Sequence, residues 1–166
     1  MAVVFLVPML AIGIWAVTHK PDVTLLKRDA FEAAVKKWES SGVSSYDMDV
    51  TFAGGDQHKD IHVEVRQGNV TKYVENGHSE SRDRWTVPHQ FAMISDDLET
   101  AESPEGFRKR TLPNVTVTLH ATFDPQYGYP QVYQRKARGK TPLVSNWVVS
   151  NFRVAKPDEA NTSSNR

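Results

Sequence analysis

The sequence predicts an α+β fold: an antiparallel sheet of about five to six strands with two helices packed on one face, preceded by an N-terminal transmembrane helix. Three observations lead to this prediction. Residues 1–17 contain no charged side chain, apolar residues recur at helical spacing in two later segments, and they alternate with polar residues in about six others. The expected order after the apolar start is α-β-β-β-α-β-β-β, which suits a mainly antiparallel sheet with its helices on one face.

The apolar start, MAVVFLVPMLAIGIWAV, is the segment from which we expect membrane attachment. About 17 to 25 apolar residues span a bilayer, whereas the apolar core of a signal peptide is shorter. Length therefore favours an uncleaved anchor. A cleaved signal peptide is the alternative, although no Lys or Arg precedes Lys20 and Ala11-Ile12-Gly13 is a weak cleavage site. A buried helix and a misplaced start codon are further alternatives.

The chain divides into three parts on this interpretation. Residues 1–20 are the anchor or signal, residues 21–154 form one α+β domain, and residues 155–166 are a disordered polar tail. The helix would cross the membrane once.

Charge and cysteine content limit the partners and the compartment. The 20 basic and 20 acidic residues balance, so no overall field favours nucleic acid, and no nucleic-acid partner is expected. The absence of cysteine excludes disulfides, thiolate metal sites and a lipid anchor on cysteine. Lys20, Lys27 and Arg28 follow the apolar run, and the positive-inside rule alone would keep the domain in the cytoplasm.

Two segments have the spacing of amphipathic helices. Residues 24–40 place apolar side chains about every four positions, and Ser40-Ser41-Gly42 ends the pattern. Thr86 can cap a second helix that has Pro88 in its first turn. The apolar stripe of this second helix consists of Phe91, Ile94 and Leu98.

The strands are predicted from alternation with a period of two. Residues 46–52 form the first strand, and residues 61–66 and 70–74 make a hairpin. The clearest alternation runs through residues 115–123, after an exposed connection at 100–112. The last two strands are expected at residues 131–135 and 144–154.

A dense cluster of turn-forming and aromatic residues, TFDPQYGYP at 122–130, joins the clearest strand to the next. Asp124 can accept backbone hydrogen bonds, and Gly128 allows a left-handed residue. These features favour a structural corner with Tyr127 and Tyr129 packed over the sheet edge. The alternative is an exposed aromatic corner that binds a ligand.

Together with other positions, this cluster resembles a family of small bacterial exported domains of unknown function, many of them lipoproteins, with a YDPxYGYP-like signature. The resemblance extends over about residues 35–153. Besides the cluster at 122–130, it rests on the spacing of Trp38, Tyr46, Val63, Val65, Gly68, Val70 and residues 87–94.

The resemblance implies an exported location but no activity. We give the exported location more weight than the charge argument that opposes it. Many members carry a Cys-x-Cys pair where this chain has Ala53, Gly54 and Gly55, so no metal or redox role is carried over.

Polar side chains on the outward face of the sheet are the second candidate contact surface. Ordinary solvation explains such a face, and the alternative is a recognition surface for a polar or protein partner. Asp49, His62, Glu64 or His120 could also serve acid-base catalysis, but a catalytic site needs a concave, partly dry pocket. The candidate interaction residues, from this face and the corner together, are Tyr127, Tyr129, His62, Glu64, Arg66 and His120.

The six histidines do not predict a metal site. His58 and His62 have the helical H-x-x-x-H spacing, but they fall in an alternating run, where a strand would hold them about 13 Å apart, too far to share an ion. We expect no metal, no other cofactor and no catalytic residue.

The leading hypothesis is a non-enzymatic binding or interaction module, tethered to the membrane by its N-terminal helix and held in the periplasm. A protein partner would bind the polar face or the aromatic corner. The alternative is a small-ligand-binding or enzymatic domain with a pocket between helix and sheet. A closed core between the helices and the sheet would exclude this alternative, whereas a deep pocket lined by Trp38, Tyr46 or Trp85 would support it.

Overall fold

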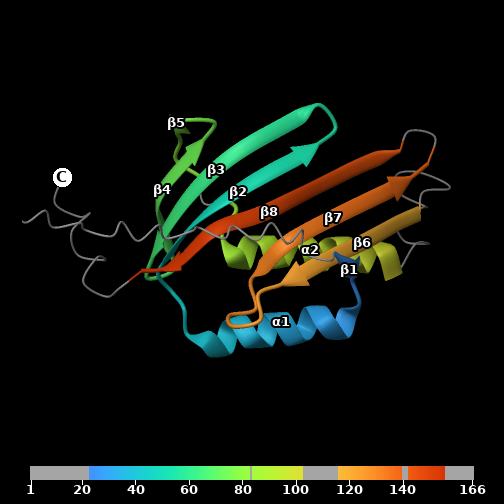
Figure 1. Cartoon of the computed structure of the whole chain (residues 1–166), viewed down its shortest axis with the longest axis horizontal. Coiled ribbons are helices and arrows are strands. Elements are labelled where there is room, and N and C mark those ends of the chain that lie inside the picture. The colour runs from blue at the N-terminus through green and yellow to red at the C-terminus, as the bar shows by residue number, and fades with distance from the viewer. Residues whose placement is uncertain (1–22, 83, 103–115, 140–141, 156–166) are drawn as a thin grey trace, which may run out of the picture.

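The computed structural model describes residues 23–82, 84–102, 116–139 and 142–155. They form an eight-stranded antiparallel sheet with the strand order β1-β6-β7-β8-β2-β3-β4-β5, together with two helices (Figure 1). In chain order the elements are β1 (Thr24–Leu25), α1 (Arg28–Ser41), β2 (Tyr46–Gly54), β3 (Gln57–Arg66), β4 (Asn69–Glu75), β5 (His78–Ser79), α2 (Val87–Glu102), β6 (Thr116–Phe123), β7 (Pro130–Arg138) and β8 (Leu143–Val154).

The sheet consists of two three-stranded meanders placed side by side. Helix α1 precedes the meander β2-β3-β4, and α2 precedes the meander β6-β7-β8. Strand β8 pairs with β2 from one end of β2 to the other and so joins the two meanders into one sheet. This pairing decides which side chains from the two halves of the chain become neighbours.

The predicted count of five to six strands is wrong, because the sheet has eight. The two extra strands, β1 and β5, contain two residues each. Strand β1 occupies the start of the region predicted as helix, where Thr24 and Leu25 pair with Ala121 and His120 of β6. Two residues show no periodicity, so only their pairing with a distant strand makes this segment part of the sheet.

The predicted N-terminal transmembrane helix is the second correction to the fold. Among the described residues, no helix combines the length and the apolar character needed to cross a membrane. The segment predicted to span, residues 1–17, lies outside the described residues, as do the predicted tail from residue 156 and most of the connection at 100–112.

Both helices of the predicted domain are present, and α1 starts later than expected, at Arg28. Gly42 ends α1 in the left-handed conformation, with φ of 66°. The hydroxyl oxygen of Thr86 accepts a hydrogen bond from the amide of His89 at 3.3 Å, which confirms the predicted cap of α2. The predicted stripe of α2 is buried and comprises Phe91, Ile94 and Leu98.

The core lies between the two helices and one face of the sheet (Figure 1). Ring contacts connect the layers: Phe31 of α1 meets Phe91 of α2 with 5.9 Å between centroids, and Trp38 of α1 meets Tyr46 of β2 at 5.5 Å. The phenol oxygen of Tyr46 accepts a hydrogen bond from the amide of Val87 at 3.0 Å, and burial raises the pKa of Tyr46 to about 12. No described helix covers the opposite face of the sheet.

The corner at residues 124–130 attaches α1 to the sheet. A carboxylate oxygen of Asp124 accepts hydrogen bonds from the amides of Gln126 at 2.9 Å and Tyr127 at 2.6 Å, which forms the predicted turn. Gly128 has φ of 86°, and a Cβ atom at this position would lie 2.5 Å from the carbonyl oxygen of Ala34 in α1. The absence of a side chain at residue 128 therefore permits the close approach of the helix and the corner.

We predict that Gly128→Ala destabilises the domain more than Gly68→Ala does. Both glycines have left-handed backbone angles, with φ of 86° and 80°, but no atom lies within 4 Å of a Cβ built on Gly68. The left-handed conformation alone costs alanine about 1–2 kcal/mol, and the overlap with α1 adds about 1–3 kcal/mol at residue 128. Urea denaturation of the two variants measures the difference, and equal losses would contradict a packing role for Gly128.

Candidate functional site

A cleft between α2 and the helix-covered face of the sheet is the strongest candidate site, and we call it the Trp85 cleft. Its volume is about 580 Å³, within the range of small-ligand sites. Strands β2, β3, β7 and β8 form its floor, and α2 with the residues just before it forms its wall. The lining residues are Phe52, Gln57, Lys59, Arg84, Trp85, His89, Met93, Asp96, Asp97, Tyr133, Ser145 and Trp147.

Four adjacent strands place one row of side chains across the floor. Lys59 of β3 pairs with Phe52 of β2, Phe52 pairs with Trp147 of β8, and Trp147 pairs with Tyr133 of β7. Residues opposite each other in neighbouring strands project to the same face. The row therefore begins with a cation, continues through two aromatic rings and ends with a phenol.

Trp85 forms the wall of the cleft and is held in a strained conformation. Its φ of 63° is unusual for a bulky residue and costs about 1–3 kcal/mol. Its amide donates to Nδ1 of His89 at 3.3 Å, and its carbonyl oxygen accepts from Nε2 of Gln90 at 2.9 Å. Its ring packs against Phe52 and Trp147, with centroids 5.4 and 5.6 Å away. Hydrogen bonds and ring contacts together fix both the backbone and the side chain of Trp85.

The acidic end of the cleft is at Asp97. Its carboxylate accepts hydrogen bonds from the hydroxyl of Tyr133 at 2.6 Å and from Nε of Arg135 at 2.9 Å. Burial, and then the hydrogen bond to Asp97, raise the pKa of Tyr133 far above its ordinary value. The phenol therefore remains protonated and donates to Asp97 throughout the physiological range.

Of the three remaining charged groups of the cleft, one is paired within the described part of the chain and two are not. The ammonium of Lys59 is 2.7 Å from a carboxylate oxygen of Glu75. By contrast, no residue among 23–82, 84–102, 116–139 and 142–155 pairs with the guanidinium of Arg84 or the carboxylate of Asp96. Both side chains are exposed at the cleft.

The uncovered face of the sheet carries a network of ion pairs around His62. Its Nδ1 lies 2.7 Å from a carboxylate oxygen of Asp49, and its Nε2 lies 3.3 Å from a carboxylate oxygen of Glu64. Both contacts are hydrogen bonds only when both ring nitrogens carry a proton. Glu64 is also 3.0 Å from the ammonium of Lys72, so the cluster extends over β2, β3 and β4.

Asp47 is the buried member of the same face. It is 8% exposed, and its two oxygens accept hydrogen bonds from Arg66 at 2.6 Å and Arg153 at 2.7 Å. Burial alone would raise the pKa of Asp47, but the two arginines hold it below the ordinary value. At the neighbouring Asp49 and Glu64 burial also acts to raise the pKa, and hydrogen bonds again outweigh it. Asn151 and His62 lower the pKa of Asp49, and Lys72 and His62 lower that of Glu64.

The structure brings together three of the six residues predicted as an interaction surface. His62, Glu64 and Arg66 lie on the same face of β3. His120 lies on β6, and β7, β8 and β2 separate it from β3, a distance of roughly 19 Å at the usual strand spacing.

The two tyrosines of the corner belong to the packed side of the sheet. Tyr129 is 8% exposed and stacks on Phe152 with 4.1 Å between ring centroids. Tyr127 is half-buried and meets the same ring at 5.9 Å. These positions fit the structural interpretation of the corner better than the ligand-binding one.

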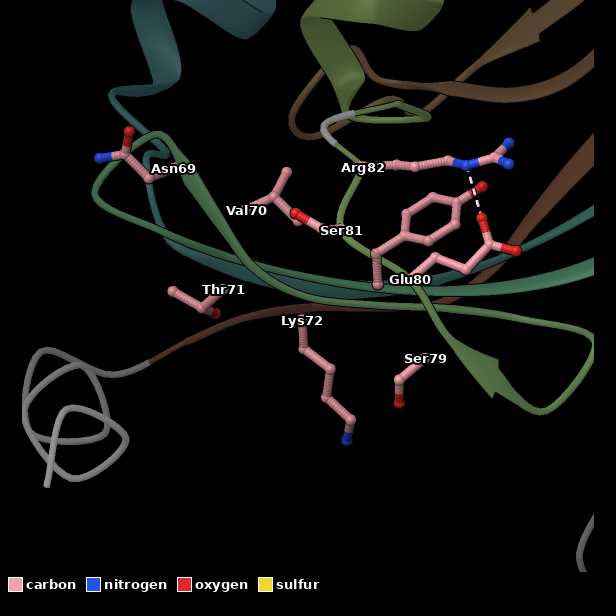
Figure 2. A pocket seen from close by; sticks show the side chains of 9 residues that line it. Asn69, Val70, Thr71, Lys72, Ser79, Glu80, Ser81 and Arg82 are labelled. Atoms are coloured by element: carbon pink, nitrogen blue, oxygen red, sulfur yellow. Dashed lines mark ion pairs between the residues drawn. The ribbon is translucent and has the colours of Figure 1, made fainter. Parts of the chain in front are cut away.

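One further depression, of about 370 Å³, lies at the start of α2 and is lined by Trp38 and Tyr46. Two more adjoin charged groups of β2, β3 and β4. The larger, of about 700 Å³, lies between the start of β4 and residues 79–82 (Figure 2). The charged side chains around it, Lys72, Glu80 and Arg82, are paired within the chain. The smaller, of about 390 Å³, lies beside Asp49 and His62. Neither has an aromatic wall comparable to that of the Trp85 cleft.

The histidines do not converge on a metal geometry in the described segments. No three His, Cys, Asp or Glu side chains in these segments are grouped so that they could hold a metal ion. His58 instead lies 3.5 Å from Asp60, its neighbour on β3.

Sequence reasoning identified only Trp85 among the residues that line the cleft. The floor residues Lys59, Tyr133 and Trp147 come from three strands, and no local pattern reveals that these strands place them in one row. The one available signal was the Trp-Thr-Val-Pro start of α2, which places an aromatic residue at the entrance to a helix.

Comparison with known proteins gives one family. The model of a family of unknown function, DUF6174, matches residues 30–134. This agrees with the expected membership of a family of unknown function, whereas the bacterial and exported character and the signature expected from the resemblance gain no support from the match. No curated protein and no solved structure matches the chain.

We predict that Asp47 makes the free energy of unfolding depend on pH in the acid range. Its pKa is lower in the folded state, so its stabilising effect is complete above the unfolded value, near pH 4, and is lost as the pH falls through the folded value. Asp47→Asn should lower the free energy of unfolding by about 1–3 kcal/mol at pH 7, because it removes the shorter of the two ion pairs of the mostly buried Arg66.

The difference between Asp47→Asn and the parent should narrow when urea denaturation is repeated at about pH 3. The control is Asp56→Asn, because Asp56 is exposed in the turn between β2 and β3. A loss that stays constant from neutral to acid pH would show that the charge of Asp47 is not the stabilising feature.

Proposed function

The chain belongs to the DUF6174 family, whose function is unknown, and we propose that it is a non-enzymatic binding domain that holds a small ligand in the Trp85 cleft. The observation that carries this proposal is the locked position of Trp85. A strained residue whose amide and carbonyl groups are both hydrogen-bonded is typical of ligand sites. Its side chain is already fixed, so binding does not cost the entropy of ordering it.

The composition of the cleft supports a binding role. Aromatic rings supply apolar area with few rotatable bonds, and a small number of polar groups around them can orient a ligand. Phe52 and the exposed edges of Trp85 and Trp147, which are 9% and 4% exposed, supply the first feature. Asp96 and Arg84 at the rim supply the second. The alternative hypothesis from the sequence names a deep pocket lined by Trp38, Tyr46 or Trp85 as its support, and Trp85 lines this cleft.

The titratable groups of the cleft favour binding over catalysis. Nδ1 of His89 accepts the amide proton of Trp85, and Asp97 accepts from Tyr133 and Arg135. The carboxylate of Asp96 is exposed at the rim, whereas a catalytic base works in a partly dry pocket. His89 and Asp97 hold the walls of the cleft in position.

The protein-interaction role expected for the polar sheet face stays a prediction. The charges of that face neutralise one another through Asp47, Asp49, Glu64, Arg66 and Lys72. A partner would have to break these pairs or accept them as they are. We therefore place the ligand on the other side of the sheet.

We predict that a neutral aromatic probe, N-acetylphenylalaninamide, binds in the Trp85 cleft. The indole N–H signals of the chain's four tryptophans can be followed separately by NMR. The probe should shift the signals of Trp85 and Trp147, and Trp38, which packs against Tyr46 instead, serves as the internal control. Shifts confined to Trp38, or none, would contradict the proposal.

The matched variant is Trp85→Asn, because asparagine tolerates the left-handed backbone of this position while removing the ring. Loss of the ring surface should weaken probe binding about 10- to 100-fold, equivalent to about 1.5–3 kcal/mol. His62→Gln on the opposite face should leave the affinity unchanged. Unchanged binding by a folded Trp85→Asn variant would exclude the cleft.

We also propose that the domain works outside the cytoplasm, as the resemblance to exported domains implies. A reporter enzyme that is active only outside the cytoplasm, fused after Arg166, should be active in cells that make the full chain. The matched fusion is a reporter that is active only in the cytoplasm. Activity of that second fusion alone would reject the proposed location.

A further inference from the structure

We infer that the ligand of the Trp85 cleft is a linear zwitterion with a flat apolar centre, of the kind formed by a short peptide of about three residues. This inference rests on the proposed binding function and adds the chemical class and orientation of the ligand. It follows from the arrangement of charges along the cleft.

Opposite charges lie at opposite ends of the cleft. The floor row runs from Lys59 on β3 to Tyr133 on β7, whose hydroxyl donates to Asp97. Arg84 comes just before Trp85, whose ring contacts both Phe52 and Trp147 of the row. Lys59 is paired with Glu75 and Asp97 with Arg135, so the charges left over are those of Arg84 and Asp96. Arg84 precedes α2, and Asp96 lies roughly 13 Å along the helix from Val87, so the cation and the anion are separated along the wall.

The centre of the cleft is apolar. The rings of Phe52, Trp85 and Trp147 form a continuous contact series, and Met93 of α2 lies on the same lining. A flat aromatic or aliphatic group placed here contacts ring surface, while charged groups on either side of it reach the two ends.

The length of the cleft sets the length of the ligand. Three strand spacings of about 4.8 Å separate β3 from β7, so the floor row covers roughly 14 Å. Along the wall, the helical rise from His89 to Asp96 is roughly 10 Å. An extended tripeptide, at about 3.3 Å per residue, has its two terminal charges at a comparable separation.

The pairing of the cleft's own charges favours a zwitterion over a simple ion. Lys59 is paired with Glu75 and Asp97 with Arg135, whereas Arg84 and Asp96 have no partner among the described residues. An organic anion would pair with Arg84 but leave Asp96 unpaired, and an organic cation would pair with Asp96 but leave Arg84 unpaired. A carboxylate toward Arg84 and an amine toward Asp96 satisfy both ends.

The test uses the tripeptide Ala-Phe-Ala in four forms: free, N-acetylated, C-amidated and capped at both ends. Titration is followed by the NMR signals of the Trp85 and Trp147 indoles. Exposed ion pairs contribute modestly, so the free peptide should bind about three- to fivefold more tightly than either singly capped form. The doubly capped form should be weaker again.

Two variants assign each peptide end to its partner. With Asp96→Asn, N-acetylation should no longer weaken binding, and with Arg84→Gln, C-amidation should no longer do so. Glu99→Gln is the matched control, because it removes a carboxylate from an exposed position of α2 that does not line the cleft. It should leave both capping effects intact.

The outcomes separate this inference from the proposed function. If the doubly capped peptide binds as tightly as the free one while shifting Trp85 and Trp147, the ligand class is wrong and the cleft remains a binding site. Capping effects that survive both variants would overturn the assigned orientation. If no form, and not the neutral probe either, shifts these two indoles in the folded protein, both proposals fail.

Discussion

The antiparallel pairing of β2 with β8 is the constraint on which the rest of the structure depends. It joins the meander of the first half to that of the second, and among the described strands only the two-residue β1 makes another connection of this kind. Its register places Phe52 beside Trp147 on the helix-covered face. The floor of the Trp85 cleft exists only because these two halves meet in this register.

The same pairing also shapes the uncovered face, through an irregularity near its far end. Between Asp47 and Asp49 the register shifts, and Asn151 of β8 has a left-handed φ of 51°. The extra residue moves Phe152 to the core side, where it contacts Trp38 and Tyr46. The side-chain amide of Asn151 then donates to Asp49 at 2.7 Å. One local distortion therefore serves both the aromatic core and the ion-pair network.

The sequence predicted the elements that local interactions determine and missed those that depend on distant pairing. The hairpin of β3 and β4, the Thr86 cap of α2 and the Asp124 turn each follow from residues close together in the chain. Strand β1 and the phase change at Asn151 depend instead on partners about one hundred residues away.

The candidate site was harder to predict for the same reason. Alternation correctly put His62, Glu64 and Arg66 on one face, but it could not tell that Asp47, Asp49 and the lysine of β4 would neutralise them. Nor could it tell that Lys59, Phe52, Trp147 and Tyr133 would line up across four strands.

Gly54 shows how a single small residue permits close packing of the cleft floor at the end of this pairing. It lies between Ser145 and Gln57 in the row next to Phe52, and a Cβ atom there would come within 2.8 Å of the Phe52 ring and 3.1 Å of the Ser145 side chain. The tip of the Phe52 ring therefore lies close to the backbone of Gly54. Any larger residue would force the Phe52 ring or the Ser145 side chain to move, and both line the cleft. The absence of a side chain at residue 54 is thus a direct determinant of the cleft's shape, as the absence of one at residue 128 is of the position of α1.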